Sequence, residues 1–188
     1  MRKWIGNVLL ASGVFVIAYV GFQHGYKLYL EKKILSDTIV TAEALLPPGV
    51  DANQEGVPND MRIVIPKLSL DVPVLEGATK DNLRVAVTHL EGTGRVGIKG
   101  ENSVILGHRS FVTGEFFSEL DKLQKGDTFS ITSSSTEFEY EVVDQKIIDP
   151  SDLSVLSTIP EESLVTLITC HPRYSSKQRL VVIAKQKG

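Results

Sequence analysis

Hydrophobic positions along this chain follow two different patterns. Residues Trp4–Tyr26 form one apolar stretch that contains no Asp, Glu, Lys or Arg. From about residue 61 onward, apolar residues come instead in short runs separated by turn-forming residues. A long uninterrupted run is typical of a membrane-spanning helix, whereas short separated runs are typical of strands.

The region 61–188 predicts a mostly β domain. Phe138, Tyr140 and Val142 alternate with glutamates, so one face of that strand meets solvent. The runs SVIL, LVTLIT and LVVIA are continuously apolar, which predicts strands buried on both faces. Such short strands favour a barrel or a sandwich. The predicted strands are Arg62–Pro66, Leu70–Leu75, Asn102–Leu106, Asp127–Thr132, Glu137–Asp144, Leu164–Thr169 and Leu180–Ala184, with one short helix at Glu115–Leu123.

The N-terminal stretch Trp4–Tyr26 predicts a membrane anchor. As a helix it would extend about 34 Å, enough to cross a hydrocarbon core of about 30 Å. A cleaved signal peptide is the alternative, but the run is long for one and no small-x-small cleavage site follows it. Basic residues flank both ends, so charge does not decide the orientation.

Three segments follow from these patterns. Residues 1–26 are the predicted anchor, 27–60 a helical stalk ending in a Pro-, Gly- and Asn-rich linker, and 61–188 the β domain. The formal net charge is −3, and nothing in the sequence resembles a basic, aromatic-interleaved nucleic-acid surface. Nucleic acid is therefore not an expected partner.

Cys170 is the single cysteine, which excludes an intramolecular disulfide and a cysteine-rich zinc site. It follows the buried run LVTLIT, and Pro172 ends that strand because proline cannot donate to a ladder. A lone cysteine is either a small buried hydrophobic residue or a reactive thiol, and a thiol needs a base or cation nearby to react at neutral pH.

Three histidines are candidate partners for Cys170. His171 is adjacent, but consecutive strand residues point to opposite faces, so it is disfavoured. His108 ends another buried run, VILGH, in which Gly107 permits a turn or a close backbone approach. His89 ends a less clearly defined strand and could line the same pocket. The fourth histidine, His24, is interpreted as an interfacial residue of the anchor.

Two arginines lie beside these runs. Arg179 opens the last buried run, QRLVVIA, and is either a surface residue over the sheet edge or a guanidinium beside a developing oxyanion. Arg109 follows His108 and would point away from it in an extended segment.

Together these segments resemble the sortase family of cysteine transpeptidases. TLITC (166–170) is similar to the family's TLxTC signature, Arg179 matches the spacing of its arginine, and VILGHRSF is similar to its histidine segment. IPKL, PVLEG and THLEGT resemble its early strands in order. The Cys-His-Pro continuation is most similar to class D.

The resemblance implies an eight-stranded β-barrel with short helices, preceded by the anchor. It implies cleavage of an LPxT-(G/A) sorting signal after Thr through a thioacyl enzyme, and transfer to a peptidoglycan-precursor amine. Cys170 would be the nucleophile, His108 the acid/base and Arg179 the oxyanion partner, with His89 and Thr169 as lesser candidates for substrate contact. The N-terminus would be cytoplasmic and the catalytic domain extracellular, on a Gram-positive type of envelope.

No cofactor is expected. Carboxylates around the loop before the cysteine strand could in principle bind Ca²⁺, but their spacing is not fixed and a solvated loop is favoured. Two other functions stay open: an anchored cysteine peptidase that passes the same intermediate to water, and a non-enzymatic wall-binding β-domain with an inert cysteine. The carboxylates concerned are Asp144, Asp149, Asp152, Glu161 and Glu162.

Overall fold

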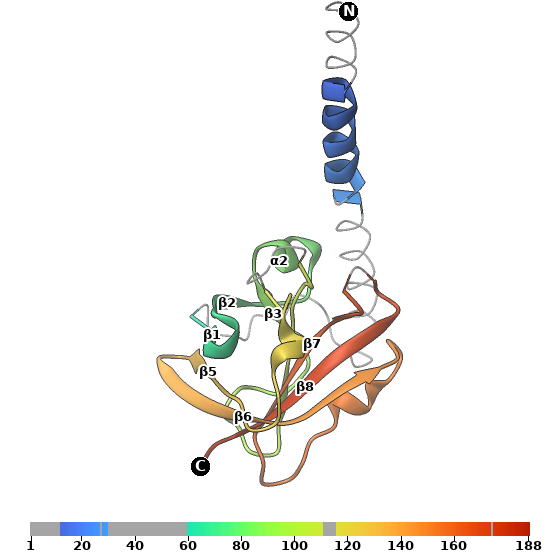
Figure 1. Ribbon diagram of the computed structural model, residues 1–188. Coiled ribbons are helices and arrows are strands. Elements are labelled where there is room, and N and C mark those ends of the chain that lie inside the picture. Colours follow the sequence, from blue (N-terminus) through green and yellow to red (C-terminus); the bar gives the residue numbers. More distant parts are fainter. Residues whose placement is uncertain (1–11, 27, 30–59, 111–115, 174) are drawn as a thin grey trace, which may run out of the picture.

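Eight strands close into a barrel in the computed structural model of the protein (Figure 1). The structure describes residues 12–26, 28–29, 60–110, 116–173 and 175–188. The strands are β1 Arg62–Ile65, β2 Leu70–Glu76, β3 Val87–His89, β4 Asn102–Leu106, β5 Thr128–Ser133, β6 Thr136–Ile148, β7 Leu164–His171 and β8 Gln178–Gln186. The short helices of the domain are η1 Pro66–Leu68, α2 Lys80–Val85, η2 Leu120–Lys122 and η3 Leu153–Leu156.

The strand order around the barrel is β1-β2-β3-β4-β7-β8-β6-β5, and β5 pairs with β1 to close it. Two pairs, β2·β3 and β4·β7, are parallel, and the others are antiparallel. The mostly β, eight-stranded barrel expected from the sequence is therefore confirmed.

The wall formed by β4, β7 and β8 is buried on both faces. Ile105, Leu167 and Val182 belong to the core inside the barrel. Their neighbours in sequence, including Ile168 and Val181, belong to a second cluster on the outer face. Leu83 of α2 and Val155 of η3 complete this outer cluster, and each fully buried aliphatic side chain contributes about 1.5–3 kcal/mol. This double burial explains why the three strands have continuously apolar sequences.

The connection between β6 and β7 is fixed to the outer face by Asn102. The amide of Asn102 donates to the carbonyl oxygens of Val155 (2.9 Å) and Ser157 (3.0 Å). Its side-chain oxygen accepts a 2.9 Å hydrogen bond from the hydroxyl of Thr166 in β7. These buried bonds hold η3 over the wall that ends at Cys170.

Several elements differ from the sequence prediction. The expected helix at Glu115–Leu123 is, over its described residues 116–123, a turn followed by the short η2, and Phe116 has a positive φ of 44° that an α-helix does not allow. Hydrogen bonds in this segment span three residues rather than four, for example from Leu123 N to Leu120 O. The helix α2 was not predicted, β3 was anticipated only as a less clearly defined strand that ends at His89, and β6 extends to Ile148.

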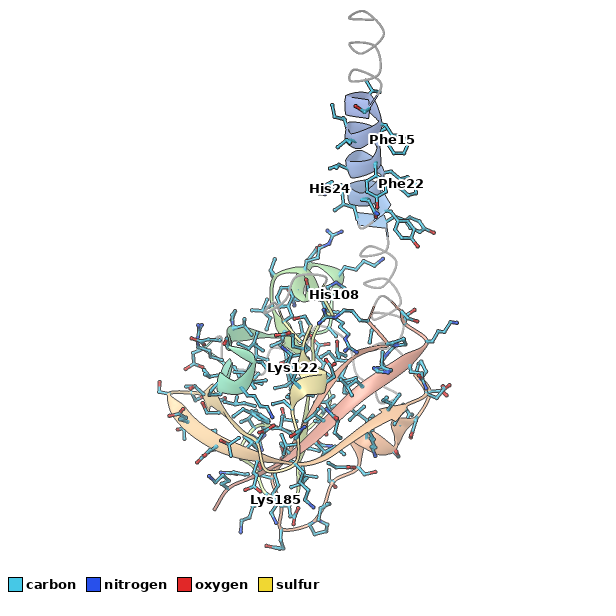
Figure 2. All side chains as sticks on the ribbon, in the orientation of Figure 1. Phe15, Phe22, His24, His108, Lys122 and Lys185 are labelled. Carbon is cyan, nitrogen blue, oxygen red and sulfur yellow. The ribbon has the colours of Figure 1, made fainter. Side chains whose placement is uncertain are left out.

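The N-terminal stretch is helical over residues 12–26 and 28–29, and Figure 2 labels Phe15, Phe22 and His24 on it. Across the described ranges, no helix combines the length and the apolar character that crossing a membrane requires. The start of the predicted anchor, residues 1–11, and most of the predicted stalk and linker, residues 30–59, lie outside the described residues.

Candidate active site

Cys170 and Arg179 lie directly opposite each other in the antiparallel pair β7·β8. Directly opposed residues of such a pair project their side chains to the same face, with Cβ atoms about 4.5–5.5 Å apart. Both residues are buried, Cys170 at 1% and Arg179 at 3% exposure. The register therefore places a thiol and a guanidinium side by side at the end of a buried wall.

His108 reaches the same place through the parallel pair β4·β7. Leu106 is the Cα partner of Ile168, and Gly107 N donates to Ile168 O at 3.1 Å, which continues the pairing past the end of β4. Two residues beyond Leu106 and Ile168, His108 and Cys170 are neighbours. His108 is 5% exposed, and Figure 2 shows it at the end of the barrel near α2.

Cys170 and Arg179 share the outer face of the barrel wall. In β7 and β8, Ile168 and Val181 belong to the outer cluster, and Cys170 and Arg179 are each two positions from them. Alternate strand residues point to the same side, so the thiol and the guanidinium also project outward. The register thus brings Cys170 and Arg179 together, while the grouping of His108 with them and the chemical roles of all three remain proposals.

Gly107 permits the close approach that was expected of it. A Cβ at this position would lie 2.3 Å from Cδ2 of Phe117, a fully buried side chain. The carbonyl oxygen of Gly107 accepts a 2.8 Å hydrogen bond from the hydroxyl of Thr169. Thr169 therefore secures the backbone beside His108, and this bond is its contribution to the site.

Arg179 is held by backbone carbonyls at the start of β8. Its Nη1 donates to Ser176 O at 2.8 Å and to Gln178 O at 2.9 Å. These bonds fix the position of the guanidinium at low conformational freedom, which suits a group that must meet a developing charge without rearranging.

A second arginine, Arg109, lies behind Cys170. Its Nη1 donates to the carbonyl oxygen of Cys170 at 3.1 Å and lies 3.1 Å from Nδ1 of His171, and its Nη2 donates to Asp121 at 2.9 Å. The sequence prediction that Arg109 points away from His108 did not anticipate these contacts. Asp121 had no signal in the sequence, because a lone carboxylate in a polar segment is most often solvated.

His171 is oriented away from the thiol, as strand alternation predicts. Burial, followed by the positive charge of Arg109, lowers the pKa of His171 below its ordinary value. Since Arg109 is always charged, Nδ1 of His171 accepts its hydrogen bond. His171 is thus fixed as a neutral imidazole in contact with Arg109.

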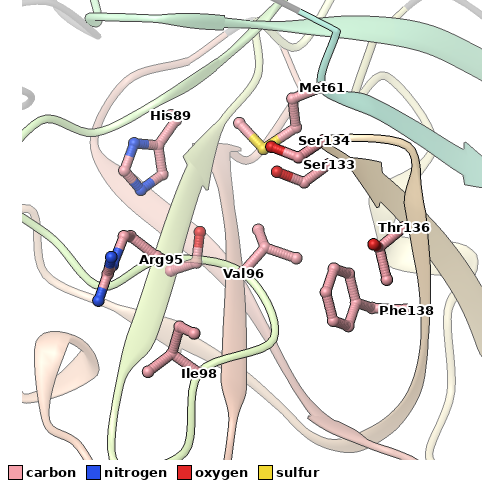
Figure 3. Close-up of a pocket in the computed structure, with 10 residues that line it drawn as sticks. Met61, His89, Arg95, Val96, Ile98, Ser133, Ser134, Thr136 and Phe138 are labelled. Carbon is pink, nitrogen blue, oxygen red and sulfur yellow. The ribbon is translucent and has the colours of Figure 1, made fainter. Parts of the chain in front are cut away.

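His89 lies in a different environment, on the inner side of the barrel wall. Its Nδ1 lies 2.9 Å from Glu76 Oε2, and its Nε2 lies 3.0 Å from Gly94 O and 3.1 Å from Thr93 Oγ1. It borders a cavity of about 310 Å³ that also meets Val96 and is drawn in Figure 3. The structure does not bring His89 to Cys170, and its predicted contact with substrate has no geometric support at that site.

Among the described residues, no group of three or more His, Cys, Asp or Glu side chains could hold a metal ion. Two of the five carboxylates considered for calcium, Asp149 and Asp152, have local partners. Asp149 accepts from Ser151, and Asp152 accepts from the backbone of Ser154.

Comparison with known proteins agrees with this geometry. A model of the sortase domain matches residues 63–187. The chain belongs to the sortase family. Sortases are cysteine transpeptidases, so this sortase is an enzyme of that type.

Relatives of this sortase span most of its length. Sortase D of Bacillus subtilis is 34% identical over 188 residues, covering 92% of this chain and 90% of that protein. Sortase A of Listeria monocytogenes is 28% identical, covering 98% of this chain and 91% of that protein.

Solved sortase structures share the fold. Sortase C-1 from Actinomyces oris superimposes with a TM-score of 0.66 at 27% identity, over 84% of this chain and 99% of that one. Sortase C2 of Group B Streptococcus pilus island 1 gives 0.68 at 26% identity, over 85% of this chain and 98% of that one.

Proposed function

We propose that this sortase cleaves an LPxT-(G/A) sorting signal after Thr and transfers the surface protein to an amine of a peptidoglycan precursor. The observation that supports this most strongly is the pairing of Cys170 with Arg179 in β7·β8, at the end of β7 toward which the parallel pair β4·β7 leads the His108 segment. The 34% identity to a sortase D favours class D.

In the first half of the reaction, the Cys170 thiolate attacks the Thr carbonyl carbon and a sulfur–carbon bond forms. Arg179 donates hydrogen bonds to the resulting oxyanion. The peptide carbon–nitrogen bond then breaks, and His108 as imidazolium protonates the leaving amine. The product of this half is a thioacyl enzyme with a neutral His108.

In the second half, the acceptor amine attacks the thioacyl carbon. His108 takes the proton from this amine, and the thiolate of Cys170 leaves as the new amide forms. Water in place of the amine would give hydrolysis, so the same site supports both a transpeptidase and a peptidase. Family membership favours both of these over an inert binding domain.

The proposed location follows from the proposed acceptor. A peptidoglycan-precursor amine lies outside the membrane, so the catalytic domain would be extracellular and the N-terminal stretch would anchor it with a cytoplasmic N-terminus. Fractionation of cells that express the full chain, with and without residues 1–26, tests this anchor. Retention of the truncated chain in the membrane fraction would contradict it.

The proposed chemistry is tested with a library of LPxT-A and LPxT-G peptides and candidate amines, such as glycine oligomers or a diaminopimelate-containing stem peptide. We expect a ligated product whose yield rises with amine concentration at the expense of the hydrolysed peptide. Hydrolysis that no amine suppresses would favour the peptidase. Added Ca²⁺ in the same assay tests calcium activation, which the spacing of the carboxylates in the sequence does not favour.

A further inference from the structure

Arg109 is almost completely buried, with 4% of its side chain exposed, and lies at the end of the barrel behind Cys170. A buried arginine is costly unless its charge and its N–H groups are matched. Two of the three groups that Arg109 contacts belong to β7, the carbonyl oxygen of Cys170 and Nδ1 of His171. The third is the carboxylate of Asp121 in η2.

These contacts join three elements that the reaction requires in fixed positions. Arg109 follows His108 directly, so its side chain ties the backbone of the histidine segment to the backbone of the nucleophile. Asp121 then ties this pair to η2. The register of β4 with β7 ends at Leu106 and Ile168, and the bond from Gly107 N to Ile168 O extends the main-chain pairing only one residue further, short of Cys170. The hydrogen bond from the Arg109 side chain to the Cys170 carbonyl oxygen therefore takes the place that a main-chain hydrogen bond has within the sheet.

Resting on the function proposed above, we propose that Arg109 is a positioning residue that sets the orientation and thiolate character of Cys170 through the Cys170 carbonyl oxygen. A guanidinium bonded to this carbonyl fixes the peptide unit after the nucleophile and thereby restricts the Cα–Cβ direction of Cys170. Its positive charge also favours the thiolate over the thiol.

The charges around Arg109 are consistent with this role. Burial is the largest influence on the pKa of Arg109 and lowers it. The charge of Asp121 raises this pKa, that of Arg173 lowers it, and that of the Cys170 sulfur raises it. The interaction with Cys170 is reciprocal. The thiolate of Cys170 stabilises the charged form of Arg109, and the charged Arg109 stabilises the thiolate by the same amount. The groups that surround the thiol and this cation are His108, Arg179, His171, Asp121 and Arg173. The lone pair on Nδ1 of His171 accepts the hydrogen bond from Arg109, so His171 stays neutral. Because this lone pair is occupied, His171 does not compete with His108 as a base.

The test measures alkylation of Cys170 by iodoacetamide between pH 5 and 10 in the full chain, together with kcat and KM on an LPxT-type peptide. Arg109→Met removes the charge and the bonds, and Arg109→Lys keeps the charge but loses the planar fork. We expect Arg109→Met to move the alkylation midpoint to higher pH and to lower kcat by about 10- to 100-fold, with KM changed less than about 3-fold. Arg109→Lys should restore the midpoint but only part of kcat.

Arg173→Met is the matched control, because Arg173 is a nearby cation whose Nη2 donates to Ser118 O. An equal shift of the midpoint in Arg173→Met would contradict the proposal, since general local charge would then explain it. If Arg109→Met does not fold, Asp121→Asn decides, because it leaves Arg109 in place and removes its anchor. We expect Asp121→Asn to lower kcat by about 3- to 10-fold.

The result that overturns the proposal is a folded Arg109→Met with the wild-type alkylation midpoint and kcat, or an unchanged Asp121→Asn where that variant decides. Such a result leaves the proposed function intact. If wild-type Cys170 itself resists alkylation and forms no thioacyl adduct, the proposed function fails instead, so the two failures are distinguishable.

Discussion

Two buried histidines end neighbouring strands of this barrel, and their surroundings differ completely. His89 ends β3 on the inner side of the wall, where Glu76, Thr93 and Gly94 occupy both ring nitrogens. His108 follows β4, at the end of the wall where Cys170 lies on the outer side. In the pair β3·β4, His89 is the partner of Ile105, an inward-facing core residue. The face of the wall, and not burial, separates a structural histidine from a candidate acid/base.

The largest expected effect on activity comes from substitution of Cys170, on the outer face of the wall. Cys170→Ala removes the sulfur that forms the thioacyl bond, so we expect no detectable cleavage or ligation. Cys170 occupies little volume and Ala retains the strand geometry, so the unfolding temperature should change only slightly. A peptide cleavage assay beside a thermal melt checks both, and substantial residual turnover would assign the reaction to another nucleophile.

The two histidines should respond in opposite ways to substitution. We expect His108→Ala to lower kcat/KM by about 10²–10⁴-fold with a small change in stability, because proton transfer by a positioned side chain contributes that much. We expect His89→Ala to lower the free energy of unfolding by about 1–3 kcal/mol, because Glu76 and Thr93 lose their partner. Its kcat/KM, corrected for the folded fraction, should fall by less than about 10-fold.

This comparison is measured with kinetics and urea unfolding on the same preparations. A large loss of kcat/KM in fully folded His89→Ala would restore His89 to the site, as the sequence prediction had it. Retained activity in His108→Ala would remove His108 from the mechanism.

Arg179 should show an intermediate effect. Loss of one oxyanion donor typically costs about 10²–10³-fold in kcat, so Arg179→Ala should be slow but measurable. Arg179→Lys keeps the charge but cannot keep both bonds to Ser176 and Gln178, and it should recover only part of the rate. Equal kcat in Arg179→Ala and wild type would show that the guanidinium is only a sheet-edge residue.

The smallest effect concerns Glu91, which is buried near His89. Burial, followed by the Glu76 carboxylate, raises the pKa of Glu91, and His89 partly opposes this. For an acid whose pKa is raised in the folded state, the stabilising contribution is lost as the pH rises through that pKa. Glu91→Gln should therefore melt slightly higher than wild type at pH 7, and the gain should vanish near pH 4, below the unfolded pKa. A gain at both pH values would mean that charge is not the cause.

Much of the barrel could be predicted from local patterns. The alternation in β6 and the continuous runs of β4, β7 and β8 are properties of neighbouring residues, so the sequence alone identifies them. The three-residue β3 is too short for any period to be visible. The turn at Phe116 comes directly before Phe117, whose ring packs against Gly107, and local sequence does not indicate such a contact.

The sequence indicated the site residues that stand at the ends of predicted strands. Cys170 and His108 each end a buried run, and alternation correctly set His171 apart. The sequence could not show whether His89 belongs to the site. The face of the wall on which His89 lies depends on the pairing of β3 with β4. Arg109 was predicted only to point away from His108, and nothing in the sequence indicated its partners. Its contact with the Cys170 carbonyl depends on the parallel pairing of β4 with β7, a long-range feature.

The most direct test of the account is intact and peptide-level mass analysis of the enzyme during turnover of an LPxT-type peptide without added amine. We predict an acyl adduct on the fragment that contains Cys170, lost on addition of the acceptor amine with formation of the ligated product. An enzyme that turns over the peptide with no adduct at Cys170, or with an adduct elsewhere, would contradict the account.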